Sequence, residues 1–299
     1  MRTVIECVPN VSEGRNSEVL SEIAAAVRSA PGVRLLDVSS DPSHNRSVLT
    51  LVGDAEGVRQ GVRALFGAAV PRIDLTRHRG EHPRMGAVDV VPIIPIRGAT
   101  VEQCVALSRE IAAEIAERYR IPVYLYEDSA TSDRRRNLAE VRKGEFEGFA
   151  DKMKAPEWKP DFGPDSPHPT AGVVAVGARA PLIAYNINLG TRDLAIADRI
   201  AKAIRHLGGG FRYVKALPVE LAERGQVQVS INMTNFRKTP LHRVFECVRS
   251  EAERHGVPIV GSEIVGLTPA EALVMTAEHY LRLENFSVDQ VLELRLLEE

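Results

Sequence analysis

The stretch VRLLDVSSDPSHNRSVLTLV, residues 33–52, decides the fold of the first half of this chain. Its two ends, Val33 to Val38 and Ser47 to Val52, are strand-like runs rich in aliphatic and β-branched residues. The segment between them is rich in Ser, Asp, Pro and Asn, which favour turns. The stretch therefore predicts two antiparallel strands joined as a hairpin.

A helix and a further strand are predicted on each side of this hairpin. Upstream, Val4 to Pro9 has a strand pattern, and a helix capped by Asn16 or Ser17 follows it. Downstream, the pattern predicts a helix from about Ala55 to Ala69 and then a strand from Ala87 to Ile96. The order βαββαβ is the split βαβ arrangement of ferredoxin-like domains, in which both helices cover one face of an antiparallel sheet. A helix at 101–119 and a strand at 123–126 extend it.

The second half of the chain repeats this order after a Pro-rich, aperiodic segment from Lys152 to Thr170, which we interpret as a linker. The predicted elements beyond it are strand 182–189, helix 191–206, strands 214–221 and 226–233, helix 241–255 and strand 257–265. The sequence therefore predicts an α/β (α+β) protein with two ferredoxin-like βαββαβ subdomains. We place them at residues 1–178, which include the Pro-rich segment, and residues 179–299.

Each predicted sheet has a second face that its helices leave uncovered. In the second half, Gln228, Ser230 and Asn232 alternate with apolar residues, as do Asn186 and Asn188. Short neutral hydrogen-bonding groups suit a wall that contacts a polar ligand, whereas a solvated face usually carries more Lys and Glu. The corresponding face of the first half is marked by Glu6, Asn10, Asp37, Ser39 and Asp41. We expect a polar ligand groove or tunnel between the open faces; two ordinary water-facing sheets are the alternative.

Composition argues against several classes of protein. A formal net charge of −2 over 299 residues is unlike that of a dedicated nucleic-acid binder. Cys7, Cys104 and Cys247 are far apart and form no C-x-x-C spacing, so neither a disulfide framework nor a zinc ribbon is indicated. The N-terminal residues do not resemble a signal peptide, and no apolar run approaches the ~20 residues of a membrane span. We expect a cytoplasmic protein that binds neither nucleic acid nor membrane.

The segment RHRGEHPRMG, residues 77–86, concentrates the chemically active side chains. Gly80 and Pro83 prevent a helix, so we expect an irregular loop of the kind that carries binding or catalysis, with a solvated connector as the alternative. We favour His82 as a general acid/base because its neighbours in the chain restrict and orient it. We place His78 at the outer end of the loop, as a surface or capping residue.

The same loop is not expected to bind a metal. His78 and His82 are four residues apart, which on a helix would direct both rings at zinc, but the loop is not helical and H-E-x-x-H is not matched. Its arginines, Arg77, Arg79 and Arg84, suit a small anionic substrate instead, because a guanidinium group binds a carboxylate through two hydrogen bonds.

Three further features receive weaker interpretations. Thr191 is expected to cap a helix whose N-terminus could also hold an anion. The glycines at 208–210 match no nucleotide-binding motif and predict a hairpin or helix end. The arginines at 134–136 are expected to lie on the solvated face of a helix.

Several motifs together resemble the formiminotransferase domain of formiminotransferase-cyclodeaminase. They cover nearly the whole chain: ECVPNVSEG (6–14), NR (45–46), HRGEHPRMG (78–86), DFGP (161–164), NINLGT (186–191) and PIVGSEIVGL (258–267). The resemblance implies two α/β subdomains with a ligand tunnel between them and glutamate formimidoyltransferase activity. This is transfer of the formimino group from N-formimino-L-glutamate to tetrahydrofolate in histidine degradation, giving 5-formiminotetrahydrofolate and L-glutamate. Tetrahydrofolate is then a co-substrate, and no metal is expected.

The resemblance also implies roles for individual residues. The family's general acid/base histidine corresponds to His82. Its folate-binding stretch corresponds to Gly163, Pro164, Asp165, Ser166, Pro167, His168, Pro169, Thr170, Ala171 and Gly172. Where animal members carry an acidic residue in the groove, this chain has Ser39, with Asp41 two places on as a candidate acid beside the histidine. We expect substrate contacts from Arg77, Arg79, Arg84, Asp37, Asp41, Asn10, Asn188 and Asn232.

Alternative functions and partners remain open at this point. The sequence ends after the transferase region, so we expect no cyclodeaminase half, a separate cyclodeaminase as a candidate partner, and a homodimer. N-formylglutamate, as a formyl donor to tetrahydrofolate, is the nearest alternative substrate. A non-catalytic folate- or anion-binding module is the alternative from another class. A ferredoxin-like RNA binder would need aromatic residues on the open sheet face, where amides and hydroxyls predominate.

Overall fold

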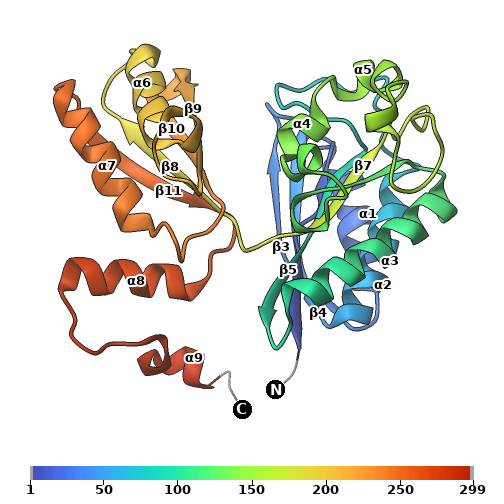
Figure 1. Cartoon of the computed structure of the whole chain (residues 1–299), viewed down its shortest axis with the longest axis horizontal. Helices are drawn as coiled ribbons and strands as arrows, with labels where there is room; N and C mark the ends of the chain where they lie inside the picture. Colours follow the sequence, from blue (N-terminus) through green and yellow to red (C-terminus); the bar gives the residue numbers. More distant parts are fainter. Residues whose placement is uncertain (1–2, 297–299) are drawn as a thin grey trace. The chain divides into compact units, whose positions relative to one another are not determined.

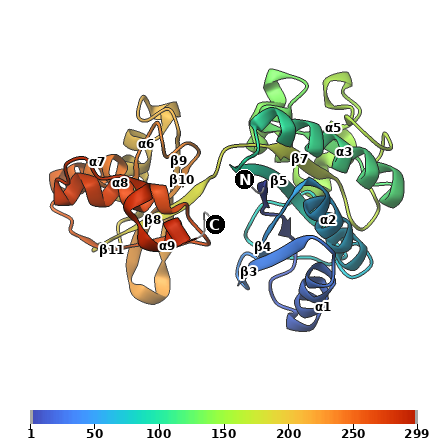
Figure 2. The same ribbon diagram turned by 90° about the horizontal axis from the view of Figure 1, so that it is seen from below.

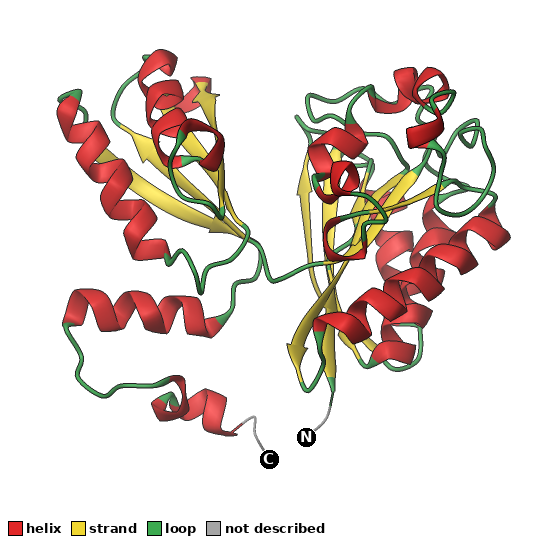
Figure 3. Cartoon of the chain, in the orientation of Figure 1, coloured by secondary structure: helices red, strands yellow, loops and turns green. Residues whose placement is uncertain are grey.

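The computed structural model of the chain describes residues 3–296. It divides into two compact units, Met1–Arg179 and Ala180–Glu299, each with its own β-sheet and hydrophobic core (Figure 1). Figure 3 shows the strands of each unit as one sheet with helices packed against it. The mixed α/β class predicted from the sequence is confirmed.

The first unit contains a seven-stranded sheet in which the predicted hairpin has the expected place. The hairpin strands β3 (Val33–Asp41) and β4 (Arg46–Gly53) pair antiparallel, and β1 (Val4–Cys7) lies between β4 and β5 (Val88–Arg97), antiparallel to both. The order β5-β1-β4-β3 confirms the split βαβ topology. The short strand β2 (Asn10–Val11) continues the line of β1 and pairs with the same neighbours.

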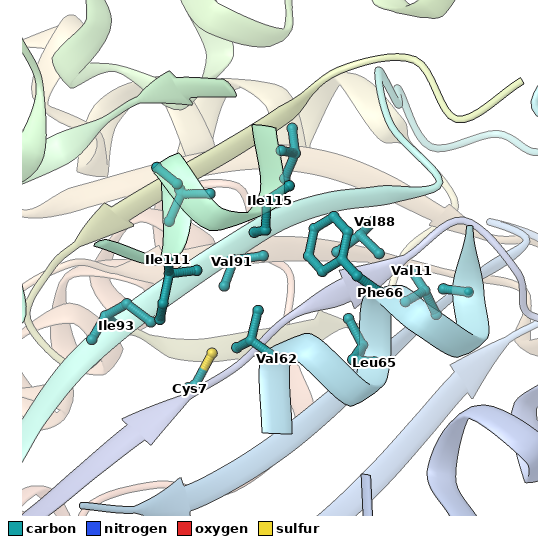
Figure 4. Close-up of a cluster of buried hydrophobic side chains, with 14 of the residues drawn as sticks. Cys7, Val11, Val62, Leu65, Phe66, Val88, Val91, Ile93, Ile111 and Ile115 are labelled. Carbon is teal, nitrogen blue, oxygen red and sulfur yellow. The ribbon is translucent and has the colours of Figure 1, made fainter. Parts of the chain in front are cut away.

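Three amphipathic helices cover one face of this sheet: α1 (Ser17–Arg28), α2 (Ala55–Ala69) and α3 (Val101–Tyr119) (Figures 1 and 2). Asn16 caps α1, as predicted, because its side chain accepts hydrogen bonds from the backbone N–H groups of Glu18 and Val19. Figure 4 shows part of the core between the helices and the sheet, where Phe66 of α2 and Ile111 of α3 belong to one cluster with Val88 and Val91 of β5 and Cys7 of β1.

The strand β7 (Val174–Ala178) is absent from the sequence prediction. It lies between β5 and β6 (Val123–Leu125) and is parallel to both. All of its residues are buried, so it has no polar alternation that would have marked it as a strand, and it follows directly after the Pro-rich segment.

The Pro-rich segment interpreted as a linker packs instead within the first unit. Trp158 is only 9% exposed, and its carbonyl oxygen accepts a 2.6 Å hydrogen bond from the hydroxyl of Tyr124. Together with α4 (Leu138–Arg142), α5 (Glu145–Lys152) and the 3₁₀ turn Pro156–Trp158, it covers the second face of β5, β6 and β7 through a separate apolar cluster. The expectation that helices cover one face only is therefore wrong for this half of the sheet.

The second unit is a four-stranded antiparallel sheet with the order β11-β8-β10-β9. Its elements follow the predicted βαββαβ order: β8 (Ile183–Leu189), α6 (Leu194–Ile204), β9 (Val214–Leu221), β10 (Gln226–Met233), α7 (Leu241–Arg254) and β11 (Ile259–Val265). The helices α8 (Ala270–Leu281) and α9 (Leu292–Leu296), which the sequence analysis did not predict, follow it. Asp193, rather than Thr191, caps α6, by accepting the N–H of Ala195.

None of the helices within residues 3–296 combines the length and the apolar character needed to cross a membrane.

Candidate active site around His82

The loop 77–86 connects α2 to β5 and is held against the turn of the β3–β4 hairpin. Asn45 in this turn donates its side-chain N–H to the carbonyl of Arg79 at 3.0 Å, and the backbone N–H of Glu81 donates to the carbonyl of Ser43 at 3.2 Å. Gly80 lies so close to the turn that a Cβ atom there would stand 2.2 Å from the carbonyl oxygen of His44. The hairpin that organises the sheet thus also positions the loop.

His78 is a buried structural residue, and the expectation that it lies at the outer end of the loop is wrong. It is 7% exposed. Its Nε2 donates to the carbonyl of Asn45 at 2.8 Å, and its Nδ1 accepts from Nε of Arg84 at 3.2 Å. Both ring nitrogens are therefore occupied in the neutral tautomer. Burial first, and then the charge of Arg84, lowers the pKa of His78 although its hydrogen bond to Asn45 acts in the opposite direction.

Arg84 fastens the other end of the loop to α5. Its two terminal nitrogens form a bidentate pair with Glu147, at 2.7 and 2.6 Å, and Nη1 also lies 3.4 Å from Glu145. Its hydrogen bonds to Glu147 lower the pKa of that carboxyl to about 2. Only 8% of the Arg84 side chain is exposed. In this arrangement its guanidinium group binds carboxylates of the chain itself and braces the loop.

His82 is half-buried, and its two ring nitrogens differ in their surroundings. Nδ1 lies 2.7 Å from the carbonyl oxygen of Pro83 and 3.3 Å from Nη1 of Arg46. The carbonyl oxygen can only accept and the guanidinium can only donate, so Nδ1 cannot satisfy both. The shorter contact places the proton on Nδ1 and leaves the lone pair on Nε2. Burial, followed by the charges of Arg46 and Arg142, lowers the pKa of His82 to about 3.

The carboxylate of Asp89 organises the two arginines beside His82. It is 0% exposed near the start of β5, and its Oδ2 accepts hydrogen bonds from Arg46 at 2.9 Å and from Arg142 at 2.8 Å. Its Oδ1 accepts the N–H of Met85, the residue that precedes Gly86 at the end of the loop. Burial alone would raise the pKa of Asp89, but Arg142 and Arg46 together lower it to about 2. Two positive charges on one negative charge leave the cluster with a formal charge of +1.

Asn10 belongs to this cluster, whereas the sequence analysis missed three of its members. The Asn10 side-chain oxygen accepts from Nε of Arg46 at 3.0 Å and from its Nη2 at 2.7 Å, so Asn10 reaches His82 through Arg46. Arg46, Asp89 and Arg142 were not predicted as site residues. Asp89 carries the one available signal, because it is a lone carboxylate in the apolar run AVDVVPIIPI.

The acidic residues predicted on the open face do not contact His82 directly. Asp41 accepts the backbone N–H groups of Ser43 and His44 and lies 3.3 Å from Nδ1 of His44. The ring of His44 is in turn 5.8 Å from that of His82, centroid to centroid. Asp37 lies on β3 opposite Thr50, and no hydrogen bond joins it to His82. The carboxylate nearest to His82 through hydrogen-bonded partners is therefore Asp89.

The remaining loop arginines are on the surface. The side chain of Arg77 is 88% exposed, with Nε 3.6 Å from Asp74. Arg79 is exposed and donates to the carbonyl of His78 at 2.7 Å. Both guanidinium groups are accessible to solvent, unlike that of Arg84.

The stretch 163–172 runs beside the histidine loop through backbone hydrogen bonds. Ala87 donates to the carbonyl of Ala171, Val173 donates to that of Met85, and Leu75 donates to that of Thr170, each at 2.9 Å. Nδ1 of His168 accepts the N–H of Ala171 at 3.0 Å and closes a turn within the stretch. The structure thus brings the predicted folate-binding residues to both ends of the loop that carries His82.

In the second unit, Asn188 and Asn232 share one sheet face but differ in exposure. Asn188 is 8% exposed and accepts a 2.8 Å hydrogen bond from Gln228, while Asn232 is exposed. Gln228 and Asn186 also donate to Glu263 of β11, at 3.0 and 3.1 Å. Glu263 was not predicted as a site residue, because its strand lies in a stretch with no regular alternation.

The arginines at 134–136 do not form a uniformly solvated face. Arg135 is buried, donates to Asp161 at 2.7 Å, and also donates to the carbonyls of Glu157 and Lys159, which precede the 163–172 stretch. Across the described residues 3–296, no group of three or more His, Cys, Asp or Glu side chains is arranged to hold a metal ion.

Comparison with known proteins places the chain in a family. Residues 4–179 match the formiminotransferase domain, N-terminal subdomain, and residues 184–297 match the formiminotransferase domain. The chain is 51% identical to a glutamate formimidoyltransferase of Streptococcus pyogenes serotype M1, over 99% of this chain and 100% of that protein. It is 45% identical to one of Thermoplasma acidophilum, over 98% and 97% of the two chains. It is also 45% identical to the formimidoyltransferase-cyclodeaminase of Sus scrofa, over 95% of this chain and 54% of that protein. The chain therefore belongs to the formiminotransferase family.

Proposed function

We propose that this protein is a glutamate formimidoyltransferase, which moves the formimino group of N-formimino-L-glutamate to N5 of tetrahydrofolate. The observation that carries the proposal is the 51% identity to a protein of that name over 99% of this chain and 100% of that protein. The loop 77–86 supports it, because it holds one histidine as a structural residue and leaves the other with a ring lone pair beside a positively charged cluster.

His82 acts as the general acid/base in this proposal. N5 of tetrahydrofolate attacks the formimino carbon, a new C–N bond forms, and Nε2 of His82 removes the proton from N5. The tetrahedral intermediate then breaks its bond to the glutamate nitrogen, and His82 returns the proton to that nitrogen as it leaves. Proton transfer of this kind contributes typically ~10²- to 10⁴-fold. The larger contribution comes from holding two substrates in reacting geometry.

The cluster of Arg46, Asp89 and Arg142 has two effects on this cycle. Its net positive charge makes the imidazolium form of His82 short-lived, so the proton passes readily to the leaving nitrogen. It also attracts the carboxylates of the glutamate moiety, and a bound carboxylate offsets the cluster's charge and brings the pKa of His82 closer to the operating pH. Arg77 and Arg79, whose guanidinium groups are exposed, are the further candidates for these carboxylates.

Tetrahydrofolate is proposed to bind through the stretch from Gly163 to Gly172 of the first unit, and Asn188 and Asn232 of the second unit are separately proposed as substrate-binding residues. The position of the stretch beside the His82 loop supports the first part, because Ala171 and Thr170 accept backbone hydrogen bonds from both ends of that loop. The exposed amide of Asn232 supports the second part, and Asn188 lies on the same sheet face but is 8% exposed and bonded to Gln228.

A coupled assay tests the proposal. Purified protein is mixed with tetrahydrofolate and either N-formimino-L-glutamate or N-formyl-L-glutamate, and the folate product is followed by absorbance. We expect turnover with the formimino donor and little with the formyl donor. Saturable folate binding without turnover of either donor would favour a binding module, and faster turnover of the formyl donor would favour the formyltransferase.

Location and assembly are part of the proposal. Cys7, Cys104 and Cys247 are all unpaired, two of them buried, which fits a reducing compartment such as the cytoplasm. We further propose a homodimer, and a separate cyclodeaminase that would use the 5-formiminotetrahydrofolate formed here. Sedimentation of the purified protein tests the first of these.

A further inference from the structure

The second sheet carries a carboxylate, that of Glu263, on the face opposite its helices. Val227, Val229, Ile231 and Met233 of β10 are buried in the core with α6 and α7, so the alternate residues of β10 lie on the other face. On that face Ser230, Asn186 and Glu263 form one cross-strand row, and Gln228, Asn188 and Gly261 form the next.

Glu263 is held in place by amides and not by a cation. Its Oε1 accepts hydrogen bonds from Gln228 at 3.0 Å and from Asn186 at 3.1 Å. Gln228 is itself 5% exposed and also donates a hydrogen bond to Asn188, which holds its side chain in place. Within residues 3–296 no Lys, Arg or His side chain forms an ion pair with Glu263, and its Oε2 has no hydrogen-bond partner. An exposed carboxylate that is oriented but unpaired is suited to a ligand that brings its own donors.

The neighbouring row supplies space for a flat group. A Cβ atom at Gly261 would have one neighbour within 4 Å, Nδ2 of Asn188 at 4.0 Å. The cross-strand row next to that of Glu263 therefore has open space over the side chain of Asn188, where Gly261 has no side chain. The free acceptor Oε2 lines the edge of this space, and the largely buried amide of Asn188 lies at its floor.

We infer that Glu263, with Asn188 and Gly261, is a recognition subsite for a planar N–C–N edge with two parallel N–H groups. This inference rests on the proposed function, since both proposed substrates contain such an edge. One is the 2-amino-4-oxopyrimidine ring of tetrahydrofolate, in which the 2-amino group and N3–H are adjacent. The other is the formimino group of the donor, which is an amidine. A formyl donor offers a single N–H and cannot form the paired contact, so the subsite also bears on the choice between the two donors.

Separate titrations of the two substrates test the inference. Tetrahydrofolate, under anaerobic conditions, and N-formimino-L-glutamate are each titrated by calorimetry into the wild-type protein and into Glu263→Gln. The substitution keeps the size of the side chain but replaces an acceptor oxygen by a donor. A charge-assisted contact of this kind is worth about 10- to 100-fold in affinity, so one of the two ligands should bind more weakly by that factor while the other changes little.

The substrate whose binding to Glu263→Gln is weaker is the one that places its N–C–N edge against Glu263. Weaker binding of tetrahydrofolate assigns the subsite to the pyrimidine ring. Gly261→Val, which fills the space above Asn188 without changing charge, should then weaken tetrahydrofolate binding as well. Weaker binding of N-formimino-L-glutamate assigns the subsite to the donor. Glu223→Gln is the matched control, because Glu223 is exposed in the turn between β9 and β10 and its substitution makes the same change of charge.

Binding of both ligands to Glu263→Gln within about twofold of wild type would overturn the inference. Turnover by the wild-type protein, measured in parallel, decides the proposed function independently. Normal wild-type turnover, with both substrates binding to Glu263→Gln as tightly as to wild type, would contradict the subsite but not the proposed reaction. If the wild-type protein binds both substrates without forming product, and one substrate binds more weakly to Glu263→Gln, the proposed reaction would be contradicted but not the subsite. A wild-type protein that binds neither substrate removes both.

Discussion

Nη1 of Arg46 lies 3.3 Å from Nδ1 of His82, close enough for its charge to act on the imidazole. The carbonyl oxygen of Pro83 is closer and accepts a hydrogen bond from Nδ1–H at 2.7 Å. The same nitrogen of Arg46 donates to the buried Asp89. Arg46 thus connects a side chain in the core of the sheet to the proposed acid/base in the loop.

Arg46→Met should raise the pKa of His82. Removing a neighbouring positive charge favours the imidazolium form, so the shift is upward from about 3. Arg46→Lys keeps the charge and should leave the pKa low. The measurement is a titration of the His82 ring signals by NMR in both variants. An unchanged His82 pKa in Arg46→Met would mean that burial and the charge of Arg142 set it without Arg46.

Asp89→Asn should destabilise the protein strongly. The substitution leaves Arg46 and Arg142, whose side chains are 12% and 14% exposed, without their shared counter-charge. Removing one partner of a buried ion pair costs about 3–5 kcal/mol. Urea unfolding gives the free energy, and Asp133→Asn, at a fully exposed carboxylate, should stay within about 0.5 kcal/mol of wild type. A decrease of less than about 1 kcal/mol in the free energy of unfolding of Asp89→Asn would contradict this, and would show that water can take the place of the carboxylate beside the two arginines.

His78→Ala should affect stability more than chemistry. It leaves the carbonyl of Asn45 and Nε of Arg84 without their partners, and each buried group left unsatisfied costs about 1–3 kcal/mol. His78→Gln can restore one of these contacts and should be milder. Thermal unfolding should show the loss, while kcat measured below the transition should fall less than in His82 variants. A folded His78→Ala protein with a larger kcat loss than His82→Ala would reverse the two assignments.

Activity should survive removal of metal ions. The mechanism proposed for His82 needs a proton carrier and bound substrates, and the two histidines of the loop, His78 and His82, do not lie on a helix that would direct them at one ion. Dialysis against EDTA followed by the transferase assay is the measurement. Loss of turnover that zinc restores would require a metal in the reaction.

The sequence predicted the fold better than it predicted the site, for physical reasons that particular residues illustrate. The helix α3 and the strands β9 and β10 have the predicted bounds because their apolar residues recur with clear periods. β7 was missed because a strand buried on both faces lacks alternation. The loop that carries His82 could be predicted from Gly80 and Pro83, which exclude a helix.

The cluster beside His82 could not be predicted in the same way. Arg142 lies on α4, far along the chain from Asp89, and nothing in the local pattern relates the two residues. The mistaken placement of His78 has a similar origin. The His78 ring contacts Asn45 of the hairpin turn and Arg84, and Arg84 is in turn held by its hydrogen bonds to Glu147. Local patterns describe elements, whereas these contacts form only when distant elements pack together.

The most direct test of the account is the turnover number of His82→Gln compared with wild type and His82→Ala, with both substrates saturating. Glutamine keeps a hydrogen-bonding group in the loop but cannot carry a proton at neutral pH. We expect kcat to fall by ~10²-fold or more in both variants, with little change in the binding of either substrate. A folded His82→Gln protein that retains near-normal kcat would contradict it, because His82 would then position a substrate without moving a proton.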